Sequence, residues 1–295
     1  THIATIGNWQ NLLFSLLLLA VGILFTCYLS RDKDNVRGKL AQWITMIASI
    51  PEFALLIIAS FRVGILAESM SVLFAGLLSF FLCIYIVSID NTVVTSPFRP
   101  ISAIGICGTM LALSMGGFSD SPDIMGEDTI RFIISLVLCV AVPLIIATIK
   151  REDFEDEPFK IAKIVMPFAM IGLNYLYPII ETVIEDLVSD SIMNYKMGDF
   201  IINAFFYILA ALSIAFGGLL VYQGVKEIKI LTINLGLLTV FTQILGIYSN
   251  IGDGNIFVFG ILLVIFGVSI IFINWKMLSI KKSQHEQLNG GGADA

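Results

Sequence analysis

Long apolar segments of about 20 residues recur along the whole chain, separated by short polar stretches. An α-helix rises about 1.5 Å per residue, so a segment of this length crosses the roughly 30 Å of hydrocarbon in a bilayer. The pattern therefore predicts nine membrane-spanning helices, at residues 9–30, 39–60, 69–89, 101–118, 130–149, 161–185, 198–221, 228–249 and 255–276.

The composition excludes a soluble fold. Of the 295 residues, 57% are hydrophobic and 14% are charged, whereas soluble domains carry about 25% charged residues. A soluble chain of this size could not bury so much apolar surface. The fold class that we expect is all-α, a polytopic integral membrane bundle of helices.

The basic residues of the loops indicate how the helices are oriented. If the loop after the first span lies inside, the inside segments hold 14 of the 17 lysines and arginines. Because Lys and Arg are retained on the cytoplasmic side, this split predicts nine crossings with the N-terminus outside and the C-terminus inside. The expected layout is an outer segment at 1–8, a transmembrane domain at 9–276 and a polar, disordered cytoplasmic tail at 277–295, in a bacterial inner (plasma) membrane.

One charged side chain interrupts the second span. Glu52 follows Pro51 in the stretch SIPEFALLIIASF, and at about 100° per residue it shares a face with Gln42, Thr45 and Ser49. A carboxylate that faces lipid costs about 2.5–3.5 kcal/mol, so Glu52 should face other helices or water. Two interpretations stay open: a neutral acid that fastens helices together, or a carboxylate that binds protons, cations or a polar solute.

Polar residues share faces on later spans as well. In the sixth span Asn174, Tyr177 and Glu181 are spaced i, i+3 and i+7 beside a proline. In the eighth span the stripe that includes Gly236 and Gln243 is typical of close helix packing. We expect the second, sixth and eighth helices to meet around a polar cavity, with Asn203 of the seventh nearby. The candidate ligand-binding or ion-binding residues are Glu52, Asn174, Tyr177, Glu181, Gln243 and Asn203.

The residues that known membrane chemistry requires are missing from the sequence. The two histidines, His2 and His285, lie near the ends, so an imidazole-based metal, haem or acid–base site within the membrane is excluded, and we expect no cofactor. No G-x-S-x-G, phosphate-binding loop or dinucleotide fingerprint occurs. Basic residues are scattered over short loops, which excludes nucleic acid as a partner. The four cysteines lie in apolar runs, where they should act as small packing residues: Cys27, Cys83, Cys107 and Cys139.

The segment 222–277, about a fifth of the chain, has a basic link, Asn234 and Gly236 at the start of a span, a short turn, and Gly260 and Gly267 in the final span. In these features it resembles uncharacterised bacterial multi-pass membrane proteins that are grouped as a domain of unknown function. The resemblance implies no activity.

Three functions are compatible with these features. The first is a transporter or channel component that binds a proton, a cation or a small polar solute in an intramembrane polar cavity. The second is a non-transporting membrane subunit or scaffold in a larger complex, and the third is a lipid-handling membrane enzyme. We expect no catalytic machinery. The expected partners are the lipid bilayer and other membrane subunits or further copies of this chain.

Overall fold

The computed structural model describes residues 36–66, 68–88, 98–117, 128–149, 158–187, 192–251 and 256–290, together with short helical pieces between 9 and 21. The outer segment 1–8 and most of the first expected span, 9–30, lie outside the described residues. The described elements are helices: α2 (Val36–Val63), α3 (Met70–Val87), α4 (Phe98–Ala112), the π-helical turn η1 (Leu113–Gly117), α5 (Asp128–Ile149), α6 (Pro158–Leu187), α7 (Ile192–Glu227), α8 (Ile230–Ile251) and α9 (Ile256–Gly290).

Within the described part of the chain, seven helices are long and apolar enough to cross a membrane. Each overlaps one predicted span, and together they confirm a helical, multi-pass integral membrane protein. The seven segments are Met70–Val87, Phe98–Gly116, Thr129–Ile149, Ile161–Val183, Phe200–Glu227, Ile230–Ser249 and Val258–Ile280. The second predicted span, 39–60, coincides with α2, and the total of nine crossings stays a prediction.

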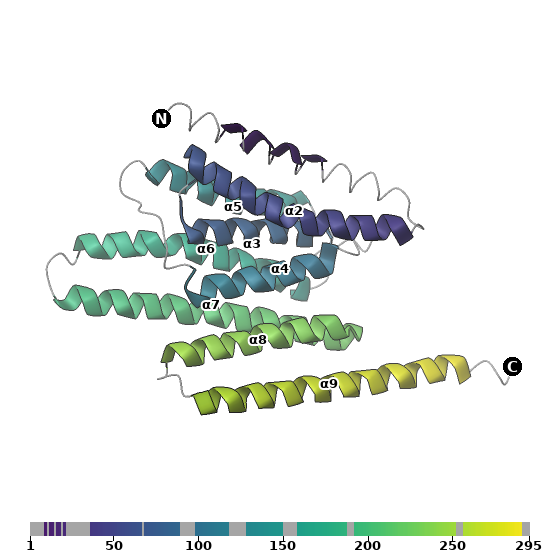
Figure 1. Cartoon of the computed structure of the whole chain (residues 1–295). Helices are drawn as coiled ribbons and strands as arrows, with labels where there is room; N and C mark the ends of the chain where they lie inside the picture. Colours follow the sequence, from purple (N-terminus) through teal and green to yellow (C-terminus); the bar gives the residue numbers. More distant parts are fainter. Residues whose placement is uncertain are drawn as a thin grey trace. The chain divides into compact units, whose positions relative to one another are not determined.

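The chain divides into two compact units, Thr1–Leu209 and Ala210–Ala295, and each is described by itself. In the first unit α3 is the central helix, because α2, α4, α5 and α6 all pack against it (Figure 1). Its side chains Leu78, Leu82 and Ile86 are completely buried. A helix that is apolar on most of its faces belongs in the interior of a bundle, where other helices cover much of it.

Ring contacts fix the neighbours of α3 and α6. Phe53 of α2 stacks on Phe80 of α3, with ring centroids 4.2 Å apart. Phe132 of α5 meets Tyr175 of α6 edge to face at 5.3 Å. Such pairs prefer these offset or edge-to-face geometries, and they hold adjacent helices in register.

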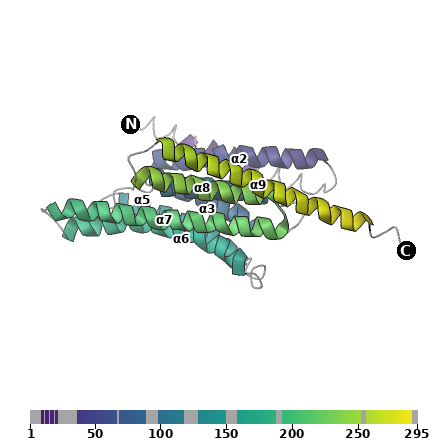
Figure 2. The ribbon, with the colours of Figure 1, turned by 90° about the horizontal axis from the view of Figure 1, so that it is seen from below.

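The second unit contains the later part of α7, followed by α8 and α9. A methyl group added at Gly217 of α7 would lie 2.9 Å from the carbonyl oxygen of Gly236 on α8. The two backbones therefore approach closely, which confirms the close packing expected for this face of α8. Phe241 of α8 stacks on Phe266 of α9 at 3.8 Å, and Figure 2 shows these two helices side by side.

Two helix ends differ from the sequence-based boundaries. The fourth span ends in η1, where Gly116 adopts a φ of 114° that favours glycine and breaks the helix. The last helix continues to Gly290, whereas the sequence suggested a span end at 276 and a tail beyond it. Lys, Gln, Glu and Leu in that extension are good helix formers, which is why the helix continues past the apolar segment.

Candidate functional site

A polar cluster lies at the N-terminal end of α3. The Ser69 side chain caps the helix and accepts hydrogen bonds from the backbone N–H groups of Ser71 and Val72, at 3.1 and 3.4 Å. The two serine hydroxyls also share a hydrogen bond of 2.7 Å. Both serines are buried. The first N–H groups of a helix have no intrahelical partner, so a buried helix start needs a cap of this kind.

Asn174 of α6 joins this cluster. Its Nδ2 donates to the backbone carbonyl of Ser71 at 3.3 Å, and its side chain is 1% exposed. Its other polar atom, Oδ1, is buried and accepts no hydrogen bond from any residue that the structure describes. Most buried polar groups have a partner, so this oxygen is the atom of the cluster that most needs a donor.

Pro178 adds a second acceptor at the same residue. Proline has no N–H, so Pro178 cannot donate to the carbonyl of Asn174, which stands four residues earlier in α6. That backbone carbonyl therefore lacks its usual helical donor. The side-chain oxygen and the backbone oxygen of Asn174 together make this turn of α6 rich in acceptors.

Tyr177 and Glu181 continue the polar face of α6. The Tyr177 hydroxyl donates to Oε1 of Glu181 at 3.1 Å, and the tyrosine ring packs edge to face against Phe205 of α7 at 5.3 Å. Tyr177 is 1% exposed, whereas Glu181 is half-buried. The spacing predicted that Asn174, Tyr177 and Glu181 share one face, and the contact between the last two agrees with it.

The oxygens on this face of α6 suit the binding of a solute that donates hydrogen bonds or carries positive charge. Asn174 and Glu181 are seven residues apart, which corresponds to about 10 Å along the helix. The oxygens offered over this length are amide, hydroxyl and carboxylate oxygens, which hard cations and hydrogen-bond donors prefer. Among the described residues, no three His, Cys, Asp or Glu side chains come together to hold a metal ion.

Glu52 lies on α2, and its side chain is half-buried. The following residue, Phe53, stacks on α3, so this part of α2 lies against the central helix. Among the described residues, the Glu52 carboxylate has no hydrogen-bond donor and no ion-pair partner. Three side chains are expected on the same face of α2 as Glu52 but are not among those that the structure describes: Gln42, Thr45 and Ser49. A role for Glu52 in binding therefore stays a prediction.

The other two candidates lie elsewhere. Gln243 of α8 is fully buried beside the buried Thr239, in the second compact unit. Asn203 of α7 is exposed. A cavity shared by the second, sixth and eighth helices stays a prediction, because α8 belongs to a unit that is described separately from α2 and α6.

Sequence reasoning missed Ser69 and Ser71. The signal that marks them is the pair of serines directly before the apolar run of α3, in the stretch ESMSVLF. Serine is a favoured helix-capping residue, so this stretch predicts a helix start. Nothing in the spacing of these serines indicates that Asn174 contacts them.

Comparisons of the chain with models of protein families, with curated proteins and with solved structures find no match.

Proposed function

We propose that this protein is a transporter or channel component that binds a proton, a cation or a small polar solute at the polar face of α6. The observation that carries the proposal is the Oδ1 atom of Asn174, which is buried without a hydrogen-bond donor among the described residues. Glu181, which accepts a hydrogen bond from Tyr177 on the same face, adds a carboxylate about two turns further along α6.

The alternative, an asparagine that only fastens two helices, explains the geometry less well. One hydrogen bond between membrane helices contributes about 0.6 kcal/mol on average, while a buried polar atom without a partner costs about 1–3 kcal/mol. The single bond to Ser71 therefore does not offset the cost of the buried oxygen. A ligand that donates a hydrogen bond, or a cation, would.

We further propose that the chain crosses a bacterial inner membrane nine times, with its N-terminus outside. The concentration of 14 of the 17 basic residues in the loops expected inside supports this orientation. In that arrangement Glu181 lies nearer the outer surface than Asn174, so a cation would meet the carboxylate first. Labelling of single cysteines in the two termini by a membrane-impermeant reagent tests the orientation.

Ion flux through reconstituted protein tests the function. Liposomes that contain the purified protein and the pH dye pyranine are given a potassium diffusion potential with valinomycin, and proton entry is recorded. Uptake of radioactive sodium and rubidium is measured in parallel. We expect flux of at least one of these ions above that of protein-free liposomes.

Two substitutions connect the flux to the site. Glu181→Gln should lower it by about 10-fold or more, because hydrogen bonds to a charged group contribute about 1.5–3 kcal/mol. Tyr177→Phe removes the hydroxyl that holds the carboxylate and should lower the flux too. Tyr207→Phe, on the exposed side of α7, is the matched control and should leave it unchanged. Equal flux in all variants would contradict the proposal, and no flux of any probe would favour a scaffold.

A further inference from the structure

Four exposed lysines gather at one end of the second compact unit. Lys226 and Lys229 flank the turn between α7 and α8, and Lys276 and Lys282 lie on the later part of α9. We call these four residues the lysine end. None of the candidate binding residues belongs to it.

Because α8 pairs with α9, these lysines lie at a similar height along the axes of the two helices. The helices run in opposite directions side by side (Figures 1 and 2), and Phe241 stacks on Phe266. Lys229 precedes Phe241 by 12 residues, and Leu278 follows Phe266 by 12 residues. The α7–α8 turn is therefore level with α9 near Lys276 and Lys282.

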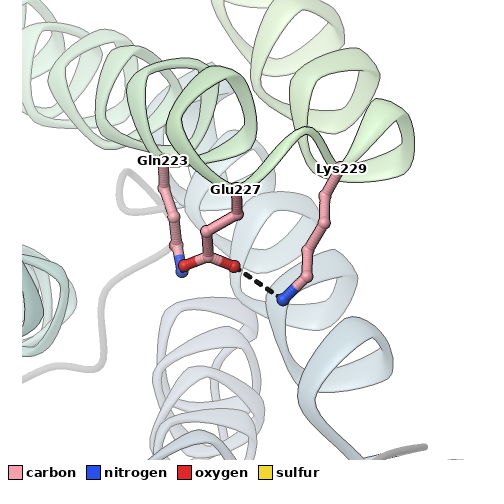
Figure 3. Close-up of polar contacts among 3 residues, drawn as sticks. All are labelled: Gln223, Glu227 and Lys229. Atoms are coloured by element: carbon pink, nitrogen blue, oxygen red, sulfur yellow. Dashed lines mark hydrogen bonds and ion pairs between the residues drawn. The ribbon is translucent and has the colours of Figure 1, made fainter. Parts of the chain in front are cut away.

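The turn contains polar contacts of its own. Figure 3 shows the Glu227 carboxylate between Gln223 and Lys229. Gln223 donates to Oε1 of Glu227, and Lys229 forms an ion pair with Oε2 at 2.6 Å. Glu227 is therefore occupied within the turn. In the sequence, the stretches 222–229 and 276–286 together carry five lysines and two glutamates, a net charge of +3.

The apolar surface of α9 ends at the lysine end. Along Val258–Ile280 none of the side chains in the most apolar stretch is buried inside the protein, so this helix presents an apolar surface that suits lipid. The distance from Val258 to Trp275 is about 26 Å along the axis, close to the thickness of the hydrocarbon layer. Trp275 is 68% exposed and Tyr222 is 50% exposed. Exposed Trp and Tyr beside Lys are typical of the level of lipid headgroups.

We propose that the lysine end binds the headgroups of anionic phospholipids at the membrane surface where α9 leaves the bilayer. The lysine stems lie along the apolar surface while their ammonium groups reach the lipid phosphates. Anionic lipid is the ligand that suits the lysine end, because net positive charge, exposed aromatic rings and the apolar surface of α9 lie together there. The inference is independent of the function proposed for α6.

Fluorescence of Trp275 tests this inference. The chain has three tryptophans, so the parent protein for the test carries Trp9→Phe and Trp43→Phe. It is reconstituted into phosphatidylcholine bilayers that contain brominated phosphatidylglycerol or, at the same fraction, brominated phosphatidylcholine. Bromine quenches the fluorescence of a nearby indole. Quenching is measured as a function of the fraction of each brominated lipid, and comparison of the two titrations gives the relative affinity of the two lipids for the site beside Trp275.

We expect phosphatidylglycerol to be preferred, and the preference to fall as salt is raised. Each lysine near an anionic surface contributes about a fivefold change in affinity. The double variant Lys226→Gln, Lys276→Gln should therefore lower the preference for phosphatidylglycerol by roughly 25-fold. Arg62→Gln, at the end of α2 in the other unit, is a matched control and should keep the preference.

Equal quenching by the two lipids in the parent protein would overturn the proposal. So would a preference that survives the double substitution, or one that Arg62→Gln removes equally. The salt titration of the parent protein needs no lysine substitution, so a variant that fails to fold does not remove the test. Soluble glycerol phosphate should not compete, because the site recognises lipid at a bilayer surface.

Discussion

The close contact between α7 and α8 can be tested with two neighbouring glycines. A methyl group added at Gly217 would lie 2.8 Å from Cγ2 of Val240 and 2.9 Å from the carbonyl oxygen of Gly236, whereas one added at Gly218 would meet nothing within 4 Å. Gly217→Ala and Gly218→Ala therefore make the same chemical change on the same helix, one inside the contact and one outside it.

The two variants should differ in stability. Alanine favours a helix over glycine by about 1 kcal/mol, and this gain is the same at both positions. Gly218→Ala should therefore stabilise the protein slightly. At Gly217 the new methyl group meets a backbone oxygen that moves only if α8 moves, and such overpacking costs about 1–3 kcal/mol. The difference between the two variants, about 1–3 kcal/mol, isolates the packing cost.

The assay is thermal unfolding of the purified protein in detergent at one heating rate, followed by helical circular dichroism and by the fraction that stays monodisperse. About 2–4 °C of melting temperature corresponds to 1 kcal/mol in proteins of similar size, so Gly217→Ala should melt several degrees below Gly218→Ala. Amide hydrogen exchange in α8 should also rise in Gly217→Ala alone. If Gly217→Ala is as stable as Gly218→Ala, the two helices do not approach through Gly217 and Gly236, and the reasoning fails.

Three further substitutions test separate features. Ile228 has a φ of 54° at the end of α7, a region that costs a β-branched residue about 1–2 kcal/mol, so Ile228→Gly should raise the melting temperature, and a lower value would contradict the strain. Ser69→Ala removes the cap of α3 and should destabilise the protein by about 0.5–2 kcal/mol in the same melting assay, with Ser269→Ala on exposed α9 as the neutral control. Glu52→Gln should abolish any dependence of stability on pH or added cations if Glu52 binds them, and unchanged ion-dependent stability would assign it a structural role.

The spans were predictable because the bilayer sets their length. About 20 apolar residues are needed to cross it, whatever their order, so seven predicted spans coincide with helices of sufficient length and apolarity. The polar face of α6 was predictable for a related reason. Helical periodicity alone places Tyr177 and Glu181 one turn apart, and the structure joins them by a hydrogen bond.

The neighbours of each face were not predictable. Asn174 contacts Ser71, which is 103 residues away in the sequence, and periodicity describes one helix without saying which other helix it meets. The end of α4 in η1 depends on the conformation of Gly116, one of 24 glycines in the chain. The extension of α9 to Gly290 follows from helix propensity rather than from apolarity.

Replacement of Asn174 should change stability and ion flux in opposite directions. Leucine has a similar size and no polar atom, so Asn174→Leu removes the buried Oδ1 that lacks a donor, at the loss of one hydrogen bond to Ser71. The cost that is relieved, about 1–3 kcal/mol, exceeds the bond that is lost, about 0.6 kcal/mol. Asn174→Leu should therefore raise the melting temperature and lower the ion flux together. If Asn174 only fastened α6 to α3, the flux of Asn174→Leu would be unchanged wherever the protein stays folded. A lower melting temperature would show that the bond to Ser71 outweighs the cost of the buried oxygen.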